Sequence, residues 1–127
     1  ASMDHTILIQ TQFSNVSLRK VNLTTAQLSI ADFSYAVLGF TNFNGLNLAN
    51  VDFSFSRSSY LQMQKCNLMN ANFTETVLMS ANFSNANLQH TKFYGASLAG
   101  AVFTNTEVKE SQFKNANLRD VKNLVFR

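Results

Sequence analysis

Apolar side chains recur at every fifth residue along most of this chain. The series begins at Leu8 and runs for 24 positions, and only Ser58 and Asn123 interrupt it. Nine of the twelve phenylalanines belong to this series. A second series, of small or medium residues, runs two positions earlier, and a polar residue, most often asparagine, lies between the two. The repeating unit is therefore a small residue, Asn or Asp, Leu or Phe, and two polar residues.

A period of five fits neither of the common secondary structures. An α-helix repeats its faces every 3.6 residues and a β-strand every two. A chain that turns through a right angle every five residues would bury both apolar series and leave the other three positions outward. Four such units close a coil of 20 residues, and stacked coils would pair as parallel strands about 4.8 Å apart. The pattern predicts an all-β fold, a quadrilateral parallel β-helix (β-solenoid) of about six four-sided coils.

Residues 20 apart should stack in columns if each coil has 20 residues. One such column contains only phenylalanine, and we expect it to form a ladder through the core, where burial of each ring is worth about 1.5–3 kcal/mol. The coil with Ser56 and Ser58 lacks two large core groups, and we expect Leu46, Val51 and Leu61 to compensate for the lost volume. The predicted ladder consists of Phe13, Phe33, Phe53, Phe73, Phe93 and Phe113.

Several units match a known sequence family closely. The segments Ala71-Asn72-Phe73-Thr74-Glu75, Ala81-Asn82-Phe83-Ser84-Asn85 and Ala116-Asn117-Leu118 resemble the A(D/N)LXX consensus of the pentapeptide repeat family. The resemblance covers about residues 6–126 in unbroken phase. It implies a right-handed quadrilateral β-helix. We therefore expect a single pentapeptide-repeat domain over residues 6–127, after a cloning remnant or disordered N-terminus at residues 1–5.

Composition and charge exclude several classes of protein. Hydrophobic residues make up 46% and charged residues 13%, about half the usual share of charge, which excludes a disordered chain. The net charge of +3 argues against an acidic surface that imitates DNA, and it is too small to favour nucleic-acid binding. There is no apolar run long enough to span a membrane. The single cysteine forms no intramolecular disulfide and is weakly consistent with a cytoplasmic protein.

No set of residues suggests catalysis. His5 and His90 lie far apart in the sequence, and Cys66 belongs to the inward series, so no nucleophile meets a base and a group that orients it. There is no glycine-rich phosphate loop and no cluster of Cys and His ligands. We expect a protein that is not an enzyme and has no cofactor, no metal and no small-molecule substrate. Asp32 and Asp52 stack one coil apart and either hold a cation or occupy the usual Asn/Asp position as solvated groups.

Aromatic residues at outward positions are the strongest candidate for a binding site. Two pairs, each 20 residues apart, border one face of the predicted helix, and a valine and an arginine lie between them. Exposed apolar patches often mark interaction sites, and aromatic residues with arginine are typical of binding hot spots. The alternative is that the rings only stack on each other and support the turns. We call this surface the aromatic face: Tyr35, Val37, Phe40, Phe55, Arg57 and Tyr60.

The first functional hypothesis is a non-enzymatic scaffold that binds an unidentified protein partner, or a second copy of itself, through the aromatic face. Some members of the resembled family imitate DNA and bind DNA gyrase, which is an alternative that the basic charge disfavours. An inert spacer within a larger protein is a further alternative. Basic residues also gather late in the chain and either are solvated or contact an acidic partner: Lys109, Lys114, Arg119, Lys122 and Arg127.

Overall fold

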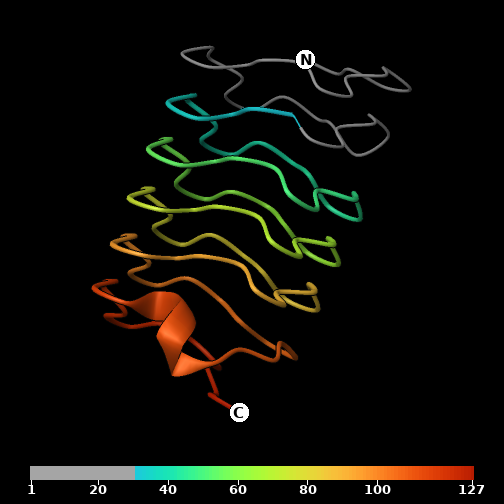
Figure 1. The fold of residues 1–127 in the computed structure, drawn as a ribbon. Coiled ribbons are helices and arrows are strands. Elements are labelled where there is room, and N and C mark those ends of the chain that lie inside the picture. Colours follow the sequence, from blue (N-terminus) through green and yellow to red (C-terminus); the bar gives the residue numbers. More distant parts are fainter. Residues whose placement is uncertain (1–30) are drawn as a thin grey trace.

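The computed structural model describes residues 31–127. In this part the chain winds in stacked coils around one axis, from residue 31 at one end to the C-terminus at the other (Figure 1). The expectations for residues 1–5 and for Phe13 lie outside the described residues. No helix in the described part is long and apolar enough to cross a membrane.

Parallel β-bridges join each coil to the next. They link residues 20 apart, from Asp32 and Asp52 near the start of the described part to Val102 and Lys122 near its end. Nearly every repeat contributes one isolated bridge residue, so the described chain has bridges in place of longer strands. Its single named element is η1, a 3-10 helix over Glu110–Phe113. The predicted 20-residue coil is therefore confirmed by the pairing.

The corners explain why asparagine and glycine recur in the repeat. The fifth residue of nearly every described unit has a positive φ, as in Asn50 (66°) and Gly45 (79°), a region that Asn and Gly tolerate best. The second residue supports the same turn, because its side-chain oxygen accepts a hydrogen bond from the backbone N–H two residues on. Asn82 does so with the N–H of Ser84 at 2.9 Å. The polar pattern therefore encodes a right-angle turn, as Asx turns do elsewhere.

The phenylalanine ladder is confirmed over the described residues. Neighbouring rings from Phe33 to Phe113 stack with centroids 4.8–5.3 Å apart and planes within 6° of parallel. Rings from the adjacent column meet them edge-on at 5.4–5.8 Å, an arrangement that aromatic pairs favour. The edge-on rings are Phe43, Phe83 and Phe103.

The serine pair in the core is buried and hydrogen-bonded. Ser56 and Ser58 have no exposed surface, and their hydroxyl oxygens lie 2.7 Å apart. Leu46, Val51 and Leu61 are buried in the same core, where the sequence placed them. The two hydroxyls satisfy each other, which removes most of the cost of burying them.

One coil departs from the regular pattern. A sequence phase unbroken to Leu118 predicts a corner at residue 110, but η1 occupies that place. Val108 pairs with Phe126, only 18 residues on, because the chain turns early at Asn123, whose φ is 59°. The expectation of regular coils to the end is wrong here. The N–H of Lys109 donates to the side-chain oxygen of Gln112 at 2.8 Å, which stabilises the helical turn in place of a corner.

Candidate functional site

The aromatic pairs stack as the sequence predicted. The rings of Tyr35 and Phe55 lie 5.1 Å apart and those of Phe40 and Tyr60 lie 4.7 Å apart, with planes within 7° of parallel in both pairs. The four side chains nevertheless keep 39–56% of their surface exposed. The pairs therefore support their corners and also offer large apolar surface to solvent.

The backbone at these corners is unfavourable for aromatic side chains. All four residues have φ between 59° and 62°, the left-handed region. This region costs an ordinary L-residue roughly 1–2 kcal/mol, whereas glycine adopts it freely and asparagine often does. Ring stacking contributes only about 0.5–1.5 kcal/mol per pair beyond the area that it buries. Backbone geometry alone therefore does not favour aromatic residues at these corners.

Val37 and Arg57 fill the strip between the two stacks. They form a parallel bridge, and Arg57 bridges onward to Val77 in the following coil. Arg57 is exposed, and no ion pair joins it to any residue from 31 to 127. Met79, with 48% of its surface exposed, extends the apolar area beside Val77. The six predicted residues thus form one surface, and its role in binding stays a prediction.

Asp32 and Asp52 have the ordinary role of their repeat position. They form a parallel bridge, and each carboxylate accepts the backbone N–H two residues on, at 2.9 and 2.8 Å. Across the described residues, no three His, Cys, Asp or Glu side chains gather where they could share a metal ion.

Cys66 is part of the core. Its Sγ lies 3.0 Å from the carbonyl oxygen of Phe43, to which the thiol donates. Burial raises the pKa of the Cys66 thiol to about 12. Because the thiolate is the reactive form, this cysteine is unreactive near neutral pH.

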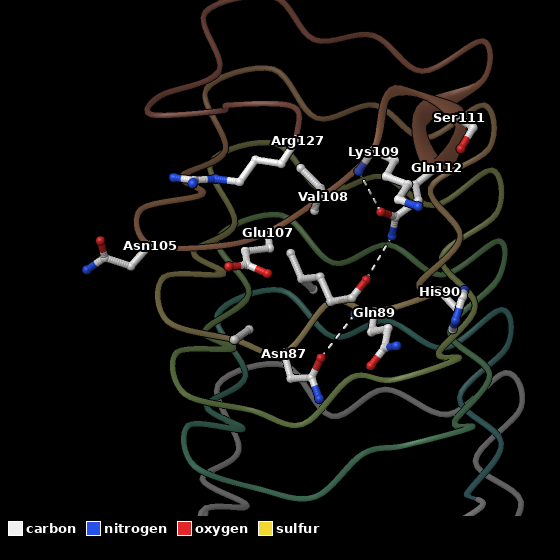
Figure 2. Close-up of a pocket in the computed structure, with 12 residues that line it drawn as sticks. Asn87, Gln89, His90, Asn105, Glu107, Val108, Lys109, Ser111, Gln112 and Arg127 are labelled. Carbon is white, nitrogen blue, oxygen red and sulfur yellow. Dashed lines mark hydrogen bonds between the residues drawn. The ribbon is translucent and has the colours of Figure 1, made fainter.

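A cleft that the five-residue pattern did not predict lies beside the irregular coil. Its volume is about 850 Å³, and it lies between the segment 86–90 and the segment 105–112, with Arg127 at its edge (Figure 2). Glu110 and Gln112 belong to η1, which displaces the wall of the coil. Their residue types do not mark this place, because Glu75 fills a regular corner and Gln62 a regular bridge position.

Gln112 closes the inner side of the cleft. Its side-chain amide donates to the carbonyl oxygens of Leu88 at 2.8 Å and Thr91 at 2.9 Å. Charged groups of both signs line the opening, with Arg127 and Lys109 on either side of Val108 and Glu107 close by. Within residues 31–127, none of these three charged side chains forms an ion pair.

The repeats identify the family. A model of pentapeptide repeats matches eight copies at residues 1–34, 31–57 and 81–120. The chain therefore belongs to the pentapeptide repeat family. Among curated proteins, none matches the sequence.

Solved structures show the same fold. A pentapeptide repeat protein from the Arabidopsis thaliana thylakoid lumen is 24% identical with a TM-score of 0.52, and the match covers 97% of this chain and 70% of that one. HetL, involved in heterocyst differentiation regulation in the cyanobacterium Nostoc sp. strain PCC 7120, is 23% identical with a TM-score of 0.47. The match covers 96% of this chain, which spans only 59% of HetL.

A third match is QnrB1, a plasmid-mediated fluoroquinolone resistance protein. It is 17% identical with a TM-score of 0.42, and the match covers all of this chain and 92% of that one. At these identities the likenesses speak for the fold alone. The family match and the Arabidopsis thaliana structure confirm the predicted class, a right-handed quadrilateral parallel β-helix.

Proposed function

We propose that this chain is a non-enzymatic scaffold and that its aromatic face is a contact surface for a protein, in the first instance a second copy of the chain. The observation that carries the proposal is the pair of aromatic stacks, which stay about half exposed at left-handed corners. Such corners favour Asn or Gly, so the aromatic residues adopt an unfavourable backbone conformation where they expose apolar surface.

The surface has the composition of a contact site. Tyr35, Phe40, Phe55 and Tyr60 are rigid rings, already ordered by stacking, so little side-chain entropy remains to be lost on binding. Arg57 between them is free to pair with a carboxylate or a carbonyl of the partner. Aromatic and arginine anchors of this kind carry most of the energy in measured interfaces.

Multi-angle light scattering tests the proposal. The wild-type chain is compared with Phe40→Ser/Phe55→Ser/Tyr60→Ser, and circular dichroism confirms that both are folded. A matched control, Asn50→Ser/Lys65→Ser/Asn70→Ser, changes three exposed left-handed corners away from the aromatic face. We expect a wild-type dimer, a control dimer and a monomeric aromatic variant.

Other results separate the remaining hypotheses. If the aromatic variant remains a dimer, the aromatic face is not the self-association surface. If all three proteins are monomers, self-association is excluded, and capture of a partner by wild type and control but not by the variant is then required. Equal capture by all three would show that the partner binds outside the aromatic face, and capture by none would favour the inert spacer.

The gyrase-binding alternative has less support. Imitation of DNA calls for an acidic surface, whereas the whole chain carries a net charge of +3 and its aromatic face carries an arginine. Loss of gyrase supercoiling activity on addition of the purified chain would reverse this ranking.

A further inference from the structure

In the regular coils, each wall (one five-residue side of a coil) pairs with the following coil through three backbone hydrogen bonds. In the wall at residues 66–70, the N–H of Leu68 donates to the backbone carbonyl of Asn87 at 2.9 Å, and the N–H of Asn70 donates to the backbone carbonyl of Gln89 at 3.1 Å. The carbonyl of Cys66 accepts the N–H of Asn87 at 2.9 Å. These three bonds leave no backbone group of this edge available to another molecule.

The next wall in the same column lacks all three bonds. In the described chain, the N–H groups of Leu88 and His90 and the carbonyl of Ala86 have no backbone partner. The segment 106–110, which should pair with residues 86–90, pairs with the last residues of the chain instead. The N–H of Arg127 donates to the carbonyl oxygen of Val108 at 2.8 Å. An unpaired strand edge therefore borders the cleft of about 850 Å³ (Figure 2).

We propose that this cleft binds an extended acidic peptide of a partner protein, which pairs with residues 86–90 as an added strand. Two N–H donors two residues apart and a carbonyl acceptor form the hydrogen-bonding pattern of a strand edge, and a peptide backbone is its natural complement. The Leu88 carbonyl already accepts the N–H of Thr91 and the side-chain amide of Gln112, so the peptide need supply only the three missing bonds.

Charge selects an acidic peptide. Lys109 and Arg127 flank the cleft without ion-pair partners in the described chain, and Glu107 is the only acidic side chain that lines it. The excess of positive charge attracts acidic side chains and repels basic ones. This site is separate from the aromatic face, so the two proposals stand or fall independently.

Nuclear magnetic resonance titration tests the proposal on the whole chain labelled with nitrogen-15. The probe is a blocked heptapeptide of alternating valine and glutamate. Two matched peptides serve as controls. In one, lysine replaces glutamate, and the other carries N-methyl groups along one edge of its backbone. We expect the first peptide to shift the amide signals of Leu88 and His90, and each matched peptide to bind at least tenfold more weakly.

Two charge variants complete the test. Lys109→Ser/Arg127→Ser should weaken binding of the acidic peptide at least tenfold. Lys114→Ser/Arg119→Ser removes the same charge outside the cleft and should leave binding within twofold of wild type. The proposal is overturned if the Leu88 and His90 signals do not move at millimolar peptide. It is equally overturned if N-methylation has no effect, or if both variants weaken binding alike.

Discussion

The side-chain amide of Gln112 bonds Leu88 at the inner side of the cleft: its Nε2 atom lies 2.8 Å from the Leu88 carbonyl oxygen. The same amide donates to Thr91, and its oxygen accepts the N–H of Lys109. One side chain thereby holds the irregular coil and η1 in place, which makes Gln112 the residue on which the cleft depends.

Replacing Gln112 tests that dependence. We expect Gln112→Ala to lower the free energy of unfolding by about 1–3 kcal/mol, because it removes hydrogen bonds from two partly buried backbone carbonyls and from one exposed N–H. Denaturant unfolding measures the change. Gln89→Ala is the control, because Gln89 lines the same cleft but its exposed side chain has no hydrogen-bond partner of its own. Equal effects of the two substitutions would show that Gln112 has no special role.

Backbone hydrogen exchange should reveal the unpaired edge in the free protein. We expect the amides of Leu88 and His90 to exchange far faster than those of Leu68 and Asn70, which occupy equivalent positions one coil earlier and are hydrogen-bonded. Exchange followed by nuclear magnetic resonance at neutral pH gives all four rates in one sample. Similar protection at the four positions would contradict the account of the cleft.

Cys66 should make stability depend on pH in the alkaline range. The pKa of its thiol is raised from 9.0 to about 12 by burial, so the unfolded chain releases this proton at a lower pH than the folded one. The stabilising contribution is therefore complete below pH 9 and is lost as pH rises from 9 toward 12, by up to about 1.4 kcal/mol per pH unit.

Comparison with Cys66→Ala isolates this contribution from those of the other ionisable groups. Alanine is the usual residue at this position of the repeat, as at Ala71 and Ala81. The free energy of unfolding of wild type should fall relative to the variant between pH 9 and pH 11. Parallel curves for the two proteins would refute the prediction.

The coil with the serine pair should depend on Leu61. Leu61 and Ala81 are both fully buried, but Leu61 lies in the coil that carries two serines where large groups are expected. We expect Leu61→Ala to cost about 2–5 kcal/mol, against about 0.5–1 kcal/mol for Ala81→Gly. Thermal melts of the two variants decide the matter, and equal shifts would exclude volume compensation by Leu61.

The fold was predictable because one local rule repeats along the chain. Each Asn or Asp, as at Asn82, bonds its own turn, and each fifth residue adopts the left-handed region, so sequence spacing maps directly onto coil geometry. The columns that follow from a 20-residue coil then place Phe33 above Phe53 and Tyr35 above Phe55. The core ladder and the composition of the aromatic face could therefore be read from position alone.

The cleft was not predictable by the same reasoning. Val108 and Phe113 keep their places in the five-residue series and are buried as expected, although the backbone between them forms η1. The apolar pattern records which side chains are inside but not how the backbone connects them. Hydrogen bonds of Gln112 with groups 21 and 24 residues away decided the local path, and no short-range pattern encodes them.

We propose that the corner aromatics serve a contact and not the stability of the β-helix. The most direct measurement is the free energy of unfolding of Phe40→Asn/Tyr60→Asn beside wild type, at a concentration where both are monomeric. Two left-handed aromatic residues cost about 2–4 kcal/mol, which exceeds the specific attraction of one stacked pair. We predict a free energy of unfolding that is higher than that of wild type, or lower by less than about 1 kcal/mol. A loss above about 3 kcal/mol, comparable to emptying a core site, would show that the stacks exist to hold the corners.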